Sequence, residues 1–273
     1  MGDQMSVVAV IPARMASSRF PGKPLLDIHG LPMVEHVRRR TLLCKEFSEV
    51  VVATCDSEIA SVVEGYGGKV LMTSPSHPGA LDRVAEAIEH IDCTHVVNVQ
   101  GDEVLVLPED LELMVRAMIA EPETVAWNGV GRVKDAGDLG DPSIVKLIVS
   151  RSNRVLFCTR NLTHVPLAEP LFEPVRLSIG VMGYSRFFLE RYQSMGRTPL
   201  EIAESIDQSR IIEHDETMRV VEFSRWYPSI NEPREVELVK KYFHGAETVL
   251  LVGLVLLLAV QGVITYWVRK KKP

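Results

Sequence analysis

Cysteine is scarce in this chain, and the few cysteines do not form a recognisable ligand pattern. Four cysteines, Cys44, Cys55, Cys93 and Cys158, occur in 273 residues, with no CxxC pair and no histidine at ligand spacing. Structural zinc sites require such spacing, and disulfide frameworks belong to small secreted domains. The pattern predicts reduced, mostly buried cysteines in a cytosolic protein.

The chain also has no excess of positive charge. The chain has 30 Lys and Arg residues against 36 Asp and Glu residues, a formal net charge of −6 at pH 7. The segment after residue 248 holds four basic residues, Arg269 to Lys272, and no acidic residue. The chain before it therefore holds 26 basic against 36 acidic residues. Non-specific nucleic-acid binding needs a broad basic face. The composition therefore argues against nucleic acid as a partner.

We expect no signal peptide at the amino terminus, because MGDQMSVVAV has no basic n-region and only a short apolar run. A long apolar run occurs only at the other end. Residues 249–268 are 20 residues without a charge, followed by RKKKP, and 20 helical residues span the roughly 30 Å hydrocarbon core of a bilayer. A buried core helix of this length would carry a polar stripe. We expect a catalytic domain over 1–244 in the cytoplasm and a single-pass membrane anchor with a basic tail over 245–273.

The orientation of this anchor stays open, because basic residues flank both ends of the span. The RKKK cluster follows it, with Tyr266 and Trp267 beside the cluster as interfacial side chains. Lys240 and Lys241 precede it.

Strand and helix patterns alternate over the first half of the chain. Apolar runs at 7–11, 49–53, 69–72 and 94–99 alternate with helical patterns at 32–44, 57–68, 81–91 and 108–120. This order predicts an α/β fold with a mostly parallel twisted sheet and helices on both faces. Further on, we expect a hairpin around 151–153, helices over 199–214 and 232–242, and a strand over 220–223. The loops at 12–24, 54–56, 73–79 and 100–103 all follow strands, so they are expected to face one crevice.

The loop IPARMASSRFPGKPL, from Ile11 to Leu25, gathers positive charge within an acidic chain. It contains Arg14, Arg19 and Lys23, with Gly22 and two prolines restricting the backbone. It matches neither GxxxxGK[ST] nor GxGxxG, so a P-loop and a dinucleotide fingerprint are excluded here. Fixed cations beside free backbone N–H groups suit a triphosphate. The alternative is a set of solvated surface cations.

A second polar loop, NVQGDEV at 98–104, ends a buried strand and presents Asp102 and Glu103. A carboxylate at a strand end suits Mg²⁺, which prefers oxygen ligands and accompanies phosphates. By itself such a turn is more often an exposed loop. Together with the cationic loop at the same sheet edge, it predicts phosphoryl or nucleotidyl transfer by positioning and charge neutralisation.

These motifs resemble one family in particular. The stretches IPARMASSRFPGKPL, GLPMVEHV, VATCD, HPGALDR and NVQGDE follow one another in the order found in cytidylyltransferases that activate acidic 2-keto-3-deoxy sugars, most closely the CMP-Kdo synthetase family. The resemblance covers about Val7 to Tyr242. It implies a nucleotide-diphospho-sugar transferase-like fold and transfer of CMP from CTP to the anomeric hydroxyl of a 3-deoxy-ulosonic acid such as Kdo. Pyrophosphate leaves, and the CMP-sugar serves surface polysaccharide or lipopolysaccharide synthesis.

The same resemblance assigns roles to residues. Catalytic roles are implied for Arg14, Lys23 and Asp102, with Asp102 and the position of Asn231 binding Mg²⁺. Substrate contacts are implied for Ser17 and Arg19 at the phosphates, Arg83 and Gln100 at cytidine, and Arg160, Ser178, Tyr184, Glu201, Asp207 and Gln208 at the sugar acid. His77 is expected to be structural or part of the phosphate loop rather than a base. Members are commonly homodimers, so a homodimer is expected.

Two departures from the family pattern leave alternatives open. Asn231 stands where the family has an aspartate that binds a second Mg²⁺, and Ser178 replaces a histidine that contacts the sugar. The chain is therefore expected to be a CMP-Kdo synthetase, with two alternatives. One is a transferase for another acidic sugar or another base. The other is a weakly active homologue that uses its anchor as a membrane scaffold.

Overall fold

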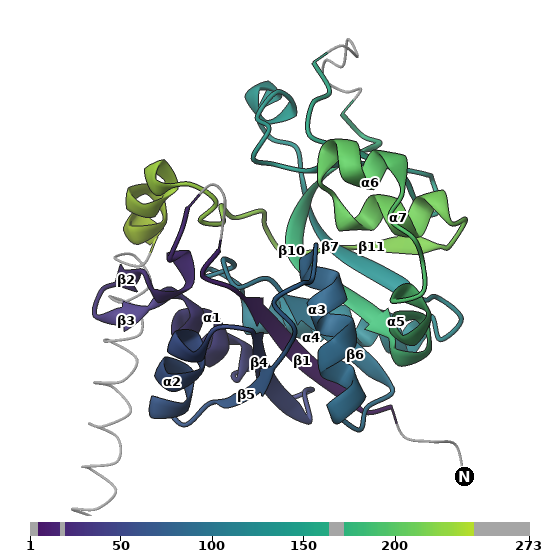
Figure 1. Ribbon diagram of the computed structural model, residues 1–273. Coiled ribbons are helices and arrows are strands. Elements are labelled where there is room, and N and C mark those ends of the chain that lie inside the picture. The colour runs from purple at the N-terminus through teal and green to yellow at the C-terminus, as the bar shows by residue number, and fades with distance from the viewer. Residues whose placement is uncertain (1–4, 17–19, 164–171, 243–273) are drawn as a thin grey trace, which may run out of the picture.

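The sheet in Figure 1 organises the whole molecule. The computed structural model describes residues 5–16, 20–163 and 172–242. In this part of the chain, the central path of the sheet has the order β11-β7-β10-β6-β1-β4-β5, and β8 joins β10 and carries β9. The strands are β1 (Val7–Ala13), β4 (Glu49–Thr54), β5 (Lys69–Met72), β6 (His95–Val99), β7 (Ala126–Arg132), β8 (Lys146–Val149), β9 (Val155–Thr159), β10 (Val175–Ser185) and β11 (Met218–Glu222). A separate ribbon pairs β2 (Asp27–Ile28) with β3 (Leu31–Pro32).

The strand directions confirm a mostly parallel sheet. β1 pairs in parallel with both β4 and β6, β4 with β5, and β7 with β11. β10 is the exception on the central path, because it runs antiparallel to β6 and β7. The expected hairpin around 151–153 is present as the antiparallel pair β8–β9. The α/β class is confirmed.

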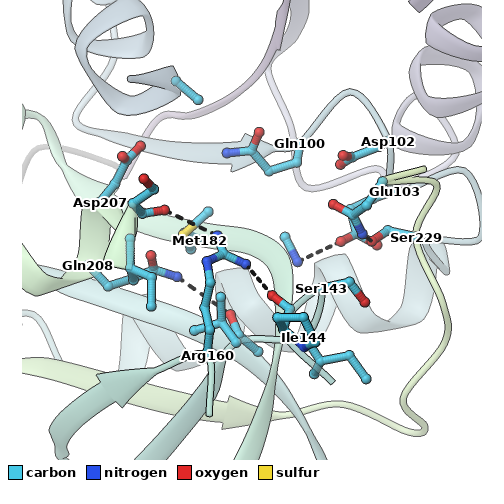
Figure 2. Close-up of a pocket in the computed structure, with 18 of the residues that line it drawn as sticks. Gln100, Asp102, Glu103, Ser143, Ile144, Arg160, Met182, Asp207, Gln208 and Ser229 are labelled. Carbon is cyan, nitrogen blue, oxygen red and sulfur yellow. Dashed lines mark hydrogen bonds between the residues drawn. The ribbon is translucent and has the colours of Figure 1, made fainter. Parts of the chain in front are cut away.

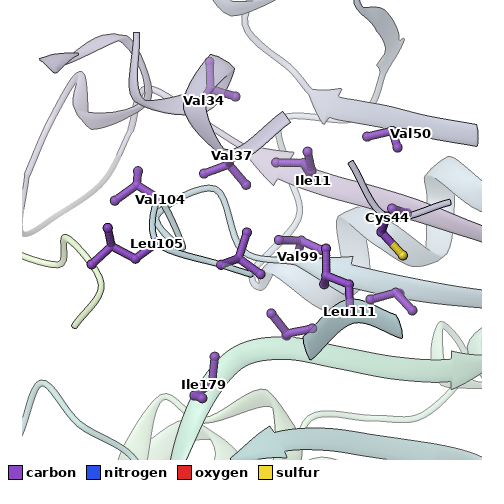
Figure 3. Close-up of a cluster of buried hydrophobic side chains, with 14 of the residues drawn as sticks. Ile11, Val34, Val37, Cys44, Val50, Val99, Val104, Leu105, Leu111 and Ile179 are labelled. Atoms are coloured by element: carbon purple, nitrogen blue, oxygen red, sulfur yellow. The ribbon is translucent and has the colours of Figure 1, made fainter. Parts of the chain in front are cut away.

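Helices cover both faces of the sheet, as the alternation of patterns predicts. α1 (Met33–Thr41), α2 (Ser57–Gly65) and α4 (Pro108–Ala120) pack on one face, whereas α3 (Ala80–Ala87), α5 (Arg186–Tyr192) and α7 (Asp207–Glu213) pack on the other. In β1, Ala9 and Ile11 join the first core, and Val8 and Val10 join the second. This period of two is that of a strand buried on both faces. Figure 3 shows the first core, with Ile11 facing Val34 and Val37 of α1.

The second half of the chain departs from the expected elements at two places. The prediction of a single helix over 199–214 is wrong. α6 (Pro199–Glu204) and α7 are separate helices, and Ser205 between them has a φ of 53°. A left-handed residue ends a helix. β7 and β10 were not predicted. Nearly all of their residues are buried. Their sequences therefore lack the alternation of polar and apolar residues that marks a half-buried strand.

Three smaller expectations concern cysteine and the carboxyl-terminal segment. All four cysteines are free, and three of them are buried, as expected. Residues 233–242 are helical, close to the expected final helix. Within the described residues no helix has the length and apolar character to cross a bilayer. The segment at 245–273, with its expected span at 249–268, lies outside the described residues and stays a prediction.

Candidate active site

Two cavities open where the parallel strands end. The larger has a volume of about 1150 Å³ and the smaller about 220 Å³. They share the lining residues Arg14, Gly79, Ala80, Gln100 and Asp102. The loops at 12–24, 73–79 and 100–103 all contribute lining residues, and Asp56 of the 54–56 loop accepts a hydrogen bond from the Met15 amide at 2.8 Å. The expectation that these loops meet at one crevice is confirmed for three of the four, whereas the 54–56 loop supports the first loop from behind.

The cationic loop places Lys23 directly on the acidic loop. Lys23 Nζ lies 2.6 Å from Asp102 Oδ2 and donates to the Ile230 carbonyl oxygen at 2.9 Å. Gly22 adopts φ 74°, which allows its amide to reach the Met15 carbonyl at 3.0 Å. This closed loop starts the short helix at Lys23–Leu25 and orients the lysine. Arg14 is exposed and lines both cavities. Ser17 and Arg19 lie outside the described residues.

The acidic loop is fixed to β10 through Gly180. The backbone N–H of Gln100 donates to the Gly180 carbonyl oxygen at 2.7 Å, and the backbone N–H of Gly180 donates to Glu103 Oε1 at 2.7 Å. Burial, and next the neighbouring Asp102 carboxylate, raise the pKa of Glu103 well above its usual range. Glu103 is thus a buried anchor, whereas Asp102 stays partly exposed toward the cavities. Figure 2 shows both residues beside Gln100 on one wall of the larger cavity.

Asn231 stands beside this acidic loop, as the assignment of a metal site requires. The Ile230 amide lies 3.3 Å from the Asp102 carbonyl oxygen, and Asn231 lines the larger cavity. Asn231 Nδ2 donates to Ser229 Oγ at 2.9 Å, so the amide nitrogen is engaged and the oxygen is the atom available to a cation. No group of three His, Cys, Asp or Glu residues within the described chain is placed to hold a metal ion.

Two polar residues expected at cytidine, Arg83 and Gln100, both line the smaller cavity. Arg83 is buried, contacts Thr73 Oγ1 and donates to Cys55 Sγ at 3.5 Å. These contacts attach α3 to the ends of β4 and β5. Together, Arg14, Lys23 and Arg83 give the smaller cavity a cationic wall.

The residues expected at a sugar acid gather at the far wall of the larger cavity. Ser178, Tyr184, Asp207 and Gln208 line it. Ser178 Oγ and Gln208 Nε2 both donate to Asn128 Oδ1, at 3.2 and 3.0 Å. Burial raises the pKa of the Asp207 carboxyl, and its Oδ2 accepts from the Leu81 amide at 3.2 Å. These four residues give this wall several hydrogen-bonding groups, beside charged lining residues such as Asp141 and Glu204.

Arg160 lies on the same wall but is strongly engaged by backbone carbonyls. Its guanidinium donates to the carbonyl oxygens of Pro142 (2.9 Å), Glu204 (2.8 Å) and Ser205 (3.1 Å). These contacts join the 141–144 loop to the turn between α6 and α7, as the dashed lines of Figure 2 show in part. Arg160 therefore shapes the cavity as well as lining it.

Glu201 and His77 are engaged away from the larger cavity. Glu201 is not among its lining residues, is buried, and pairs with Arg210 at 2.6 Å and Arg197 at 3.0 Å. It also caps α6 through the Thr198 amide. The structure does not bring Glu201 to the sugar-side wall, because Arg210 holds it between α6 and α7. His77 pairs with Glu86 instead of pointing to a reacting group, as expected for a structural histidine.

Two buried residues behind the cavity wall escaped sequence reasoning. Asn128 on β7 orients Ser178 and Gln208, yet a single asparagine in an unrecognised strand carries no signal. Lys146 on β8 is fully buried. A lysine within the apolar run IVKLIVS was a visible anomaly, because lysine is almost never fully buried without a partner.

Comparisons with known proteins agree with this geometry. The model of the family described as cytidylyltransferase matches residues 8–218. The 3-deoxy-manno-octulosonate cytidylyltransferase of Geobacter metallireducens is 37% identical over 247 residues, covering 86% of this chain and 96% of the relative. The 8-amino-3,8-dideoxy-manno-octulosonate cytidylyltransferase of Shewanella piezotolerans is 34% identical over 239 residues, covering 86% and 97%.

A solved structure extends the likeness to three dimensions. The structure of a CMP:2-keto-3-deoxy-manno-octonic acid synthetase complexed with CTP superimposes with a TM-score of 0.81 at 31% identity. The match covers 88% of this chain and 99% of that one.

Proposed function

Because the chain belongs to the cytidylyltransferase family and is a nucleotidyltransferase, we propose that it transfers CMP from CTP to the anomeric hydroxyl of a 3-deoxy-ulosonic acid such as Kdo. The products are the CMP-sugar and pyrophosphate. The observation that carries this proposal is the pair of adjoining cavities, a smaller one that holds Arg14, Lys23 and Arg83 and a larger one lined by polar and charged side chains, which meet at Arg14, Gln100 and Asp102.

The smaller cavity supplies the groups that a triphosphate needs. Arg14 and Lys23 bring two positive charges to it, and Lys23 is held by two of its three possible hydrogen bonds. Arg83 and Gln100 add donors for the base. Fixed charges placed where negative charge develops stabilise a transition state without reorganisation. Arg14 and Lys23 thus take the catalytic roles, and Ser17 and Arg19 are proposed at the same phosphates from the loop sequence.

The donor set at the acidic loop fits Mg²⁺. Asp102 offers a partly exposed carboxylate, and Asn231 offers an amide oxygen on the adjoining segment. Mg²⁺ is usually held by one or two carboxylates together with substrate phosphates, so this pair suffices for a cation that arrives with CTP. When bound, the ion neutralises charge on the phosphates. Lys23 at 2.6 Å keeps the Asp102 carboxylate aligned.

The larger cavity suits a polyhydroxylated acid. Ser178, Gln208, Tyr184 and Asp207 supply neutral or buried hydrogen-bonding groups, and Arg160 supplies a cation for a carboxylate. Its volume of about 1150 Å³ holds a sugar acid beside the nucleotide. Attack by the anomeric hydroxyl then needs the two substrates in contact where the cavities meet, and this positioning contributes much of the rate.

A different acidic sugar is the second candidate, and Ser178 favours it. A serine hydroxyl is shorter than the histidine expected at this place in the family, so the pocket is reshaped at one contact. The Shewanella relative is described as acting on an 8-amino sugar, so substitution on this sugar class occurs among similar proteins. A third candidate, a weakly active membrane-bound homologue, rests on Asn231.

Pyrophosphate release tests the proposal. The purified protein is mixed with CTP, excess Mg²⁺ and one of several acids: Kdo, its 8-amino analogue and other sugar acids. We expect release with one of the 3-deoxy-ulosonic acids and with CTP in preference to UTP. Asp102→Ala should lower kcat at least a hundredfold, the scale of losing one transition-state charge contact. Asp135→Ala, in an exposed turn, is the matched control.

The outcomes separate the candidates. No release with any acid would refute the transferase proposal. Release with only a different acid or nucleotide would favour the second candidate, and slow release that Asp102→Ala leaves unchanged would favour the third. Two further proposals come from the sequence and family: attachment to the cytoplasmic side of a membrane through 249–268, and a homodimer.

A further inference from the structure

Lys146 on β8 is a buried cation held by three backbone carbonyls. Its side chain has no exposed surface. Nζ donates to the carbonyl oxygens of Asp141, Ile144 (2.8 Å) and Arg160 (2.7 Å). An ammonium has three N–H donors, so these contacts use all of them. Each N–H group of the buried ammonium thus has a carbonyl acceptor.

The three carbonyls belong to segments that form the wall of the larger cavity. Residues 141–145 line it continuously, and Arg160 lines it from the end of β9. The loop is further shaped by Asp141 Oδ1, which accepts from the Ser143 amide and hydroxyl at 2.8 and 2.7 Å. Arg160 in turn donates to Pro142 and to the turn between α6 and α7. Lys146 is therefore the point at which the loop and Arg160 are held together.

The surroundings of Lys146 carry charge of both signs. Burial lowers its pKa to about 8; the Asp141, Asp138 and Glu204 carboxylates oppose this shift, and the Arg160 guanidinium adds to it. Burying an ammonium has a free-energy cost that only complete hydrogen bonding offsets. The wall therefore depends on a proton that is partly lost in mildly alkaline solution.

We infer that Lys146 is a positioning residue for the sugar acid: its ammonium holds the 141–144 loop and Arg160 in the arrangement that binds the sugar. This inference rests on the proposed function. Lys146 touches neither substrate, because it lies behind the wall with its donors turned to carbonyls. The CTP side of the site depends on other segments, so the effect is confined to the sugar.

The test compares Lys146→Met with Lys69→Met. Methionine keeps an unbranched chain of similar length but has no donor. Lys69 pairs with Glu49 at 2.7 Å at the edge strand β5, is half-exposed, and so provides the same charge change away from the cavity. We expect Lys146→Met to raise the KM for the sugar acid at least about tenfold, the scale of misplacing a bound group. The KM for CTP should stay within about twofold, and Lys69→Met should change neither.

Hydrogen–deuterium exchange gives a readout independent of turnover. In the full-length protein, Lys146→Met should speed exchange in peptides covering 141–145 and leave those covering 100–107 unchanged. An unchanged sugar KM together with unchanged exchange overturns the inference, as does an equal rise in both KM values. Absence of turnover in the wild-type enzyme refutes the proposed function instead, and the exchange experiment then still decides whether Lys146 holds the loop.

If Lys146→Met does not fold, the pH dependence of the wild-type enzyme tests the inference instead. The ammonium is charged below pH 8 and loses its proton above it, since its pKa is about 8. The KM for the sugar acid should therefore rise between about pH 7 and about pH 9.5. The KM for CTP is no fixed reference over this range, because the pKa of Glu103 in the acidic loop is about 8. A KM for the sugar acid that stays constant over this range would overturn the inference.

Discussion

Asn231 is a neutral residue at a position where the family pattern is expected to have an aspartate. Asn231 lines the larger cavity together with Asp102, and its amide nitrogen donates to Ser229 Oγ. The acidic loop thus brings one carboxylate to a cation where an aspartate at 231 would add a second. Lys23, at 2.6 Å, already neutralises much of the charge of Asp102. For the proposed Mg²⁺ site, we therefore predict weak attraction for the ion before CTP binds.

We predict that Asn231→Asp strengthens Mg²⁺ binding. A second carboxylate adds a charged oxygen ligand, and we expect the Mg²⁺ concentration for half-maximal activity to fall roughly tenfold, equivalent to about 1.4 kcal/mol. Calorimetric titration of Mg²⁺ into the CTP complex measures the same change without turnover. Asn153→Asp, in the exposed turn between β8 and β9, is the control. An unchanged metal dependence would exclude a metal contact at position 231.

At the scale of elements, β10 joins the two halves of the site. It pairs with β6, which ends in the acidic loop, and with β7, which carries Asn128. Its pairing with β7 shifts between Ser178 and Met182, and this irregularity turns Gly180 toward Gln100 and Glu103. One strand thereby fixes the relative position of the acidic loop and the wall of the larger cavity that holds Ser178.

We predict that Gly180→Ala damages both stability and activity. A Cβ at this position would lie 2.6 Å from Glu103 Oε1 and 2.9 Å from Gln100 Cβ, closer than atoms can approach. We expect unfolding free energy to fall by about 1–3 kcal/mol, measured by urea denaturation, with a larger relative loss in kcat. Gly196→Ala, where a Cβ meets nothing within 4 Å, should change neither. Equal stability of the two variants would contradict the close approach seen here.

At the scale of the whole molecule, the catalytic part and the expected anchor are close in sequence. The described helix ends at residue 242, and the apolar run begins at residue 249. An anchored enzyme would release its product at the membrane surface, where enzymes that use activated sugars for surface polysaccharide would meet it at high local concentration. This arrangement is a proposal from the sequence.

We predict that removal of residues 248–273 converts a membrane-bound enzyme into a soluble one. The full chain should sediment with membranes after cell lysis, because 20 uncharged residues partition into the bilayer. The truncated chain should stay in the supernatant with kcat within about twofold of the full chain, since the cavities are built from residues before 242. Full-length protein in the supernatant would refute the anchor, and an inactive truncated enzyme would show a role beyond attachment.

The first half of the fold and the nucleotide side of the site could be predicted from sequence because their signals are local. Strands and helices up to residue 120 alternate with clear periods, and the loops after parallel strands meet at one edge by topology. Arg14, Lys23, Gln100 and Asp102 therefore converge as expected. Their roles in catalysis stay predictions until the variants are measured.

The amino-acid sequence by itself determined the α/β class, the cationic and acidic loops and the family, since each depends on residues that are neighbours along the chain. Only the tertiary structure decided that Glu201 pairs with Arg210, that Glu103 anchors Gly180, and that Lys146 binds carbonyls from two distant segments. The Glu103–Gly180 contact depends on the long-range pairing of β6 with β10, and the Glu201–Arg210 pair on the packing of α6 against α7. The Lys146 contacts lie in the β8–β9 hairpin, which the sequence did predict, but the burial of its ammonium comes from the sheet around it. No local pattern specifies these contacts, because packing of the whole sheet selects them.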